Sequence, residues 1–176
     1  MNLLETIKDA FKPLMNGEKP PLQVGEVMNL WFYLTATDQT MRGEEVSYNT
    51  AQDPELKEAV KDVLDNVHGP IHKELHDFLR DEGVELPVTT SPKPLEPYKL
   101  IPEGAKMTDD EIANLLVFNL TLGIQSACQG LVQSTRADVG MMFSRYQMMK
   151  ITMSIKMKDL MGRKGWLRVP PPYNKH

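Results

Sequence analysis

The chain has 176 residues and a formal net charge of −4 at pH 7, because 24 acidic side chains outnumber 20 Lys and Arg side chains. A chain of this length forms one domain around a single core. The interspersed charges exclude a large basic face for nucleic acid. The single cysteine excludes a disulfide within the chain. The first residues lack the uninterrupted apolar stretch of a secretory signal, so we expect synthesis in the cytoplasm.

The first predicted elements are a short N-terminal helix or arm at 1–17 and a long helix at about 20–48. The long helix begins at a pair of prolines, which suit a first turn. On its predicted apolar face, Asp38 and Arg42 lie four residues apart, so we expect them to be buried and paired, with Lys156 as the other partner for Asp38. A catalytic base at Asp38 is the less favoured interpretation. The apolar residues of this face are Val24, Val27, Met28, Trp31, Leu34 and Met41.

A second helix is predicted from 54 to about 82. Asp53 is an N-cap residue, and Pro54 takes the first helical position. Pro70 follows Gly69 within the helical pattern and predicts a kink or break near His68, because proline removes a backbone hydrogen bond and crowds the preceding turn. The residues predicted to face inward are Leu56, Val60, Val63, Val67, Ile71, Leu75 and Phe78.

Residues 84–107 are rich in proline and show no helical periodicity. They predict an extended connection of about two dozen residues, which is long for a compact domain. A helix bundle needs such a connection where two successive helices run in the same direction, since the chain must then cross the bundle from end to end. We therefore expect a long crossover between the second and third helices.

The third helix begins at a capping box formed by Thr108 and Glu111 and ends near 134–137. Residues 112–135 contain no Asp, Glu, Lys, Arg or His. A helix that is apolar on all sides is buried by its own domain, by a partner subunit or by lipid. Its five amide side chains favour protein over lipid, so we expect no membrane partner. Its small residues favour a homodimer through this helix, and these are Gly123, Ser126, Ala127 and Gly130.

The fourth helix is predicted from about 138 to 161, where Gly162 and Gly165 end it. The tail at 162–176 is expected to be extended. The predicted fold is all-α, a ferritin-like up-down four-helix bundle with a short N-terminal helix, in a single domain at 1–176. The inward residues of the fourth helix are Val139, Met142, Phe143, Tyr146, Met149, Met153, Met157 and Leu160.

Metal-binding ferritin-like bundles carry Glu-x-x-His pairs on two helices and a Glu on each of the other two. This chain has no Glu-x-x-His, and its third helix has Asn119 and glutamines in place of carboxylates, so a di-iron centre is not expected. His72 and His76, with Glu26 from the first helix, could still share one transition metal ion. We favour hydrogen-bonded or solvated histidines beside the kink, and we expect no cofactor. We expect His68 and Asn119 to be buried polar groups.

Sulfur-containing side chains allow one more alternative. We expect Cys128 to be a small buried residue of the uncharged stretch. The methionines of the fourth helix are predicted to pack in the core because their spacing of four follows an apolar face. The alternative is a pocket between the third and fourth helices that carries a small ligand. The methionines that would line it are Met149, Met153 and Met157.

Three segments resemble a family of uncharacterised proteins from endospore-forming bacteria. They are EVMNLW at 26–31, the stretch 72–87, and RADV at 136–139 together with KGWLRVPP at 164–171. Members of this family are ferritin-like bundles, and some are described as spore coat proteins similar to coat protein F. The resemblance implies a structural, coat-associated role and carries over no set of enzymatic residues.

The favoured interpretation is a non-enzymatic structural protein that acts through self-association in the spore coat or during sporulation. The expected partners are a second copy, through 112–135, and other coat proteins. The main alternative is a metal-binding bundle that uses His72 and His76, and the second alternative is the Met-lined carrier.

Overall fold

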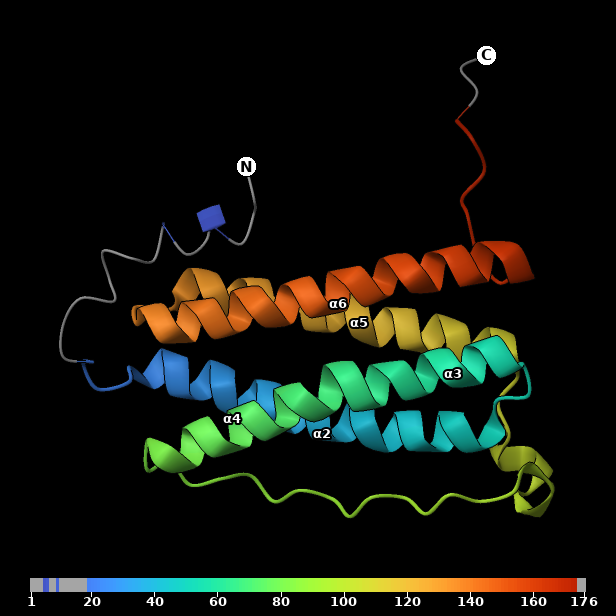
Figure 1. Ribbon diagram of the computed structural model, residues 1–176, viewed down its shortest axis with the longest axis horizontal. Helices are drawn as coiled ribbons and strands as arrows, with labels where there is room; N and C mark the ends of the chain where they lie inside the picture. Colours follow the sequence, from blue (N-terminus) through green and yellow to red (C-terminus); the bar gives the residue numbers. More distant parts are fainter. Residues whose placement is uncertain (1–4, 7–8, 10–18, 174–176) are drawn as a thin grey trace.

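The computed structural model describes residues 5, 6, 9 and 19–173 and shows four long helical rods that lie side by side (Figure 1). No strand occurs among these residues. The arm expected at 1–17 lies almost entirely outside the described residues. The rods are α2 (Val24–Thr50), the continuous rod α3 (Pro54–Val63), η2 (Leu64–His68) and α4 (Gly69–Asp81), then α5 (Asp109–Gln133) and α6 (Ala137–Lys164).

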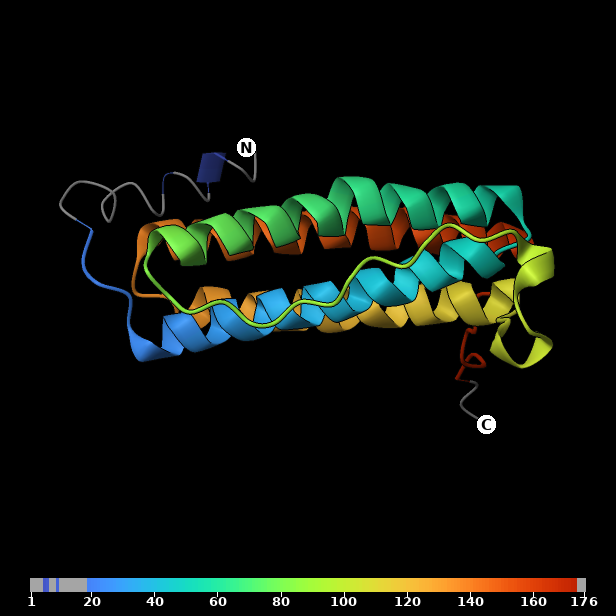
Figure 2. The same cartoon turned by 90° about the horizontal axis from the view of Figure 1, so that it is seen from below.

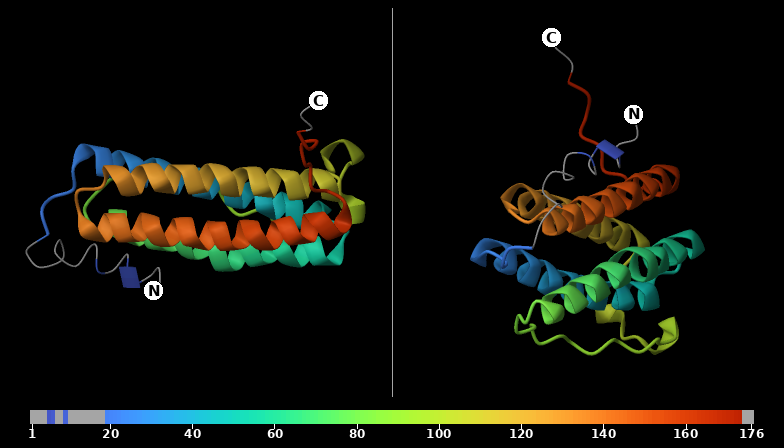
Figure 3. Two further views of the ribbon diagram at one scale, coloured as in Figure 1. Left: turned by 90° about the horizontal axis from the view of Figure 1, so that it is seen from above. Right: turned by 60° about the vertical axis from the view of Figure 1, so that its left-hand side comes forward.

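The order of the rods confirms the predicted bundle with one long crossover. Rod α3–α4 returns antiparallel to α2, and α5 and α6 form a second antiparallel pair (Figure 1). Between α4 and α5 the chain runs the whole length of the bundle along the outer side of α2 and α4 (Figures 2 and 3). Two short 3₁₀ turns, η3 (Tyr98–Leu100) and η4 (Glu103–Ala105), end this segment before α5 begins.

Local signals set most of the helix ends. Asp53 accepts the backbone N–H groups of Glu55 and Leu56, and Thr108 forms the expected capping box at the start of α5. Gly165, with φ of 75°, ends α6 in the left-handed conformation.

The first long helix begins at Val24 and not at the prolines. A residue that precedes proline is pushed toward an extended conformation, so the first of two prolines cannot begin a helix.

The second helix is interrupted where Pro70 predicted it. The chain forms a π-helical turn, η2, in which the Gly69 N–H donates to the Leu64 carbonyl, five residues back. This wider turn accommodates the proline without ending the rod. A Cβ atom at Gly69 would lie 2.9 Å from the Leu64 oxygen, so this position requires glycine.

The core lies between the four rods. The inward residues predicted on the second and fourth helices are buried or partly buried there, which confirms both apolar faces. On α2 the predicted face is wrong in part, since Val24 is 85% exposed and Met28 is also exposed, whereas Leu34 is buried as predicted. Leu30 and Tyr33, which are not on the predicted face, join Leu34 in the core.

Helix α5 is buried on one side only. Leu115, Phe118, Leu122 and Val132 are exposed on its outer side, and Cys128 is exposed as well, contrary to expectation. By length and composition, the helix within Glu103–Gln133 could cross a membrane, and 22% of its most apolar window is buried within the chain. The uncharged stretch therefore has a face that its own bundle does not cover.

Candidate functional site

The crossover is held by polar side chains that recur along one side of α2. The Trp31 indole N–H donates to the Glu85 carbonyl, at 3.1 Å. Asp38 accepts the backbone N–H and the hydroxyl of Thr90, at 3.0 and 2.9 Å. Farther along, Glu45 accepts the N–H of Lys93, and Asn49 bonds the backbone of Pro94 and Glu96. We call the set Trp31, Asp38, Glu45 and Asn49 the crossover-binding side of α2.

The expected pairing of Asp38 with Arg42 or Lys156 is not formed. Asp38 is buried, as predicted, but its hydrogen bonds come from the crossover. Arg42 pairs with Glu45, at 3.1 Å, and Lys156 pairs with Asp62, at 3.3 Å. The reason is that the crossover brings backbone donors onto α2, which helical spacing within one element does not reveal.

The three histidines of the second helix become more exposed along the chain, and His68 is buried as predicted. His68 is fully buried, and its Nδ1 atom lies 2.7 Å from a carboxylate oxygen of Glu44. Burial lowers the pKa of His68, while the Glu44 carboxylate acts in the opposite direction. His72 is partly buried, 3.6 Å from Asp38, and its ring stacks on that of the more exposed His76.

The structure does not assemble the proposed metal ligands His72, His76 and Glu26. The buried Glu26 carboxylate accepts the backbone N–H groups of Gln23, Thr135 and Arg136, at 2.8 to 2.9 Å. Glu26 therefore caps the start of α2 and of α6, because the first N–H groups of a helix need an acceptor outside it. Within 5, 6, 9 and 19–173, no three His, Cys, Asp or Glu side chains are placed to hold a metal ion.

Arg136 extends this contact at the same end of the bundle. Its guanidinium group donates to both carboxylate oxygens of Glu82, at 2.6 and 2.8 Å, and to Asp138. The Glu26 carboxylate beside it is affected by two opposing causes. Burial raises the pKa of Glu26, but the backbone hydrogen bonds that it accepts hold the pKa below its usual value. The resemblance motif at 136–139 thus joins the ends of α2, α4 and α6.

A buried lysine lies at the centre of the bundle. The Lys150 residue on α6 is 4% exposed, and its ammonium group lies 4.9 Å from the centre of the Tyr33 ring. A Cβ atom at Gly123 would be 2.4 Å from Nζ, so the end of the lysine occupies space that a side chain at position 123 would fill. Burial lowers the pKa of Lys150 to about 8, against the opposing effect of Glu44.

Lys150 reaches a groove of about 500 Å³ between α2 and α5. The groove has polar groups from Tyr33, Asn119, Ser126 and Gln129, and apolar walls that include Phe32. Asn119 is only partly buried and lines the groove, whereas we expected it to be buried. We call this hollow the α2–α5 groove.

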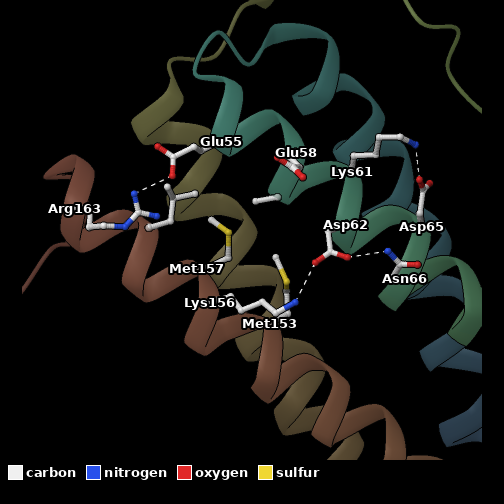
Figure 4. Close-up of a pocket in the computed structure, with 12 residues that line it drawn as sticks. Glu55, Glu58, Lys61, Asp62, Asp65, Asn66, Met153, Lys156, Met157 and Arg163 are labelled. Atoms are coloured by element: carbon white, nitrogen blue, oxygen red, sulfur yellow. Dashed lines mark hydrogen bonds and ion pairs between the residues drawn. The ribbon is translucent and has the colours of Figure 1, made fainter.

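None of the main hollows in the described part of the chain is the Met-lined pocket of the second alternative. Met153 and Met157 are buried, and they border an open groove between α3 and α6 (Figure 4). Ion pairs of Arg163 with Glu55 and of Lys156 with Asp62 cross that groove. Helices α5 and α6 pack closely at Gly130, where a Cβ atom would lie 2.5 Å from the Phe143 ring.

Periodicity and motif searches missed Glu44 and Lys150, the two charged residues of the bundle centre. A signal for Lys150 was present, because it follows Tyr146 by four residues and precedes Met153 by three on the apolar face of α6. A single charge on such a face indicates a buried ionisable group. Glu44 gave no comparable signal, since α2 has no continuous apolar face.

Comparison with known proteins agrees with the resemblance found in the sequence. Residues 11–176 match the family described as "Protein of unknown function (DUF3231)". The chain belongs to the DUF3231 family. A relative, the uncharacterized protein YvdQ of Bacillus subtilis strain 168, is 29% identical over 157 residues, which are 89% of this chain and 91% of YvdQ.

Solved structures show the same architecture. A protein of Bacillus halodurans C-125, described as a "putative spore coat protein", matches this DUF3231 chain with a TM-score of 0.84 at 31% identity, over 89% of this chain and 98% of that one. The conserved hypothetical protein rv2844 of Mycobacterium tuberculosis matches with a TM-score of 0.63 at 15% identity, over 77% of this chain and 96% of that one, which shows a shared fold alone. None of these descriptions names a catalysed reaction.

Proposed function

We propose that this chain is a non-enzymatic, ferritin-like structural protein of the spore coat or of sporulation, and that it acts through self-association. The observation that carries this proposal is an exposed apolar surface shared by two helices. This surface, which we call the α2–α5 face, is formed by Val24, Met28 and Phe32 of α2 and by Leu115, Phe118, Leu122 and Val132 of α5. The similarity to the Bacillus halodurans protein described as a "putative spore coat protein" supports the cellular setting.

A second copy of the chain is the occupant that suits the α2–α5 face. Soluble monomers rarely leave a large contiguous apolar patch uncovered. The outer side of α5 between 112 and 133 carries no charge, so two copies can approach there without like-charge repulsion. Gln125 and Gln129, also exposed on this side, offer donors and acceptors to a partner.

Analytical ultracentrifugation tests this contact. We expect the wild-type chain to sediment as a dimer at micromolar concentration and Phe118→Glu to sediment as a monomer, because a buried unpaired carboxylate opposes association. Ile155→Glu is the matched control, since Ile155 is an exposed apolar residue of α6, outside the face. A monomeric wild-type chain at 100 µM, roughly a hundredfold above the Kd of a micromolar dimer, would contradict the proposal.

The cellular part of the proposal has a separate test. In the organism that encodes the chain, we expect synthesis to begin during sporulation and the protein to be recovered from the insoluble outer layers of the spore. An antibody against the purified protein would follow both. Constant amounts in growing cells, with none in the spore coat fraction, would contradict a coat role even if the purified chain is dimeric.

A further inference from the structure

The Lys150 ammonium group has no hydrogen bond and no ion pair with any residue that the structure describes. Its contact with the Tyr33 ring, at 4.9 Å, replaces only part of the hydration lost on burial. A buried charge is normally paired, because desolvation of an isolated ammonium ion is costly. Since the ammonium group borders the α2–α5 groove, that groove is where an external partner can reach it.

The groove and its continuation combine a polar end with a long apolar end. Near Lys150, the hydroxyl of Ser126 and the amides of Asn119 and Gln129 line the hollow. Toward the start of α2, a second hollow of about 460 Å³ shares Met28 and Phe32 with it. The lining of this second hollow is almost entirely apolar, and it consists of Leu22, Val24, Val27, Met28, Trp31 and Phe32.

We propose that the α2–α5 groove binds an aliphatic carboxylate, with its head group against Lys150 and its chain along α2 toward Val24. Val24 and Tyr33, the α2 residue beside Lys150, are nine residues apart, which corresponds to roughly 14 Å along a helix. A linear chain can therefore follow the apolar wall for about two and a half turns.

The charges around Lys150 favour a singly charged head group. Glu44 is close enough to influence the lysine electrostatically, and its second carboxylate oxygen is buried without a hydrogen-bond partner. A dianion such as a phosphate monoester would add excess negative charge beside Glu44, whereas one carboxylate balances one ammonium group. The neighbouring amides and hydroxyl can complete the hydrogen bonds of the head group.

Isothermal titration with sodium laurate below its critical micelle concentration tests the site. We expect saturable binding of one laurate per chain, at least roughly tenfold weaker binding to Lys150→Met, and a similar loss when dodecanol replaces laurate, since both changes remove a charge-assisted contact. Lys156→Met, on the same helix but outside the groove, should bind laurate like the wild type. Equal affinity for laurate and dodecanol, or full affinity in Lys150→Met, would overturn the proposal.

A second variant covers the case in which Lys150→Met does not fold. Gly123→Ala would place a methyl group 2.4 Å from the present position of Nζ, so the flexible end of the lysine would have to move away. We expect this variant to keep its helical circular dichroism and to lose laurate affinity. Normal affinity would contradict the inference.

The inference does not rest on self-association, although the groove and the proposed dimer contact share Met28, Phe32 and Leu122. The second hollow also shares Val24 with that contact. Titrations in the Phe118→Glu background separate the two, because Phe118 does not line the groove. Laurate binding by a monomeric wild type would contradict the dimer alone. A dimer that binds no laurate, in either background, would contradict the site alone.

Discussion

Lys150 shows how a single residue can oppose the stability of the fold that contains it. Its ammonium group is almost fully buried beside the Tyr33 ring and has no anionic partner within hydrogen-bond distance in the described part of the chain. Functional sites commonly retain such groups at a cost in stability. A methionine at position 150 would keep most of the packing and remove the charge.

We expect Lys150→Met to raise the free energy of unfolding at pH 7 by roughly 3 kcal/mol, because each unit between the folded and unfolded pKa values of a group corresponds to about 1.4 kcal/mol. The folded pKa of Lys150 is about 8, below its ordinary value of 10.5. The penalty is therefore complete below pH 8 and disappears as the pH rises to 10.5. Urea unfolding of both proteins at pH 7 and pH 10.5 measures this.

The pH dependence provides the control, since a change in packing alone would give the same difference between the two proteins at both pH values. A difference that does not shrink toward pH 10.5 would show that the charge of Lys150 does not destabilise the fold.

His68 should affect stability at low pH. Because burial lowers its pKa, His68 makes the protein lose stability as the pH falls below about 6.5.

At the scale of elements, Glu26 joins two helix starts that lie far apart in the sequence. We expect Glu26→Gln to lower the free energy of unfolding by about 2–3 kcal/mol, because the amide cannot accept all three backbone N–H groups with the strength of a carboxylate. Urea unfolding at pH 7 measures the change. Since the pKa of Glu26 is lowered in the folded state, the difference from the wild type should narrow as the pH falls below 4.5.

Glu58→Gln is the matched control for this substitution, since Glu58 is an exposed residue of α3. It should change stability by no more than about 0.5 kcal/mol. If Glu26→Gln were equally mild, the carboxylate would not be the main cap of α2 and α6.

The crossover-binding side of α2 accounts for the position of the crossover. We expect Asp38→Asn to loosen the segment near Thr90, because one of its two hydrogen bonds there becomes weaker, at a cost of about 1 kcal/mol. Hydrogen exchange of the Thr90 amide should then be roughly fivefold faster. Amides in the middle of α6 should exchange at wild-type rates.

Asp65→Asn serves as the control, because Asp65 is exposed and pairs with Lys61 on its own rod. Its effect on the Thr90 amide should be negligible. Unchanged exchange at Thr90 in Asp38→Asn would mean that Glu45 and Asn49 hold the crossover without help from Asp38.

At the scale of the whole molecule, the bundle has two different long sides. The side formed by α2 and α4 is covered by the crossover, which satisfies the buried polar groups of α2 (Figure 2). The α2–α5 face has no such cover from the described part of the chain. This asymmetry explains why the same helix, α2, contributes both to a covered polar side and to an exposed apolar surface.

Much of the architecture could be predicted from the sequence. The N-cap at Asp53, the capping box at Thr108 and the interruption before Pro70 were each readable within a few residues, and the structure confirms them. The apolar face of α2 was not readable. Four of its positions serve the crossover, and polar residues at buried positions disturb the 3.6-residue pattern on which such predictions depend.

The sequence by itself determined the helices, their order and the long crossover, because caps, prolines and apolar periodicity act over short distances along the chain. Only the tertiary structure decided the partners of the polar residues. Asp38 meets Thr90 across 52 residues, and Glu26 meets Arg136 across 110. Lys150 lies beside Glu44 and Gly123 without a hydrogen bond to either. Such contacts depend on how the helices pack against one another, and no local pattern in the sequence encodes that packing.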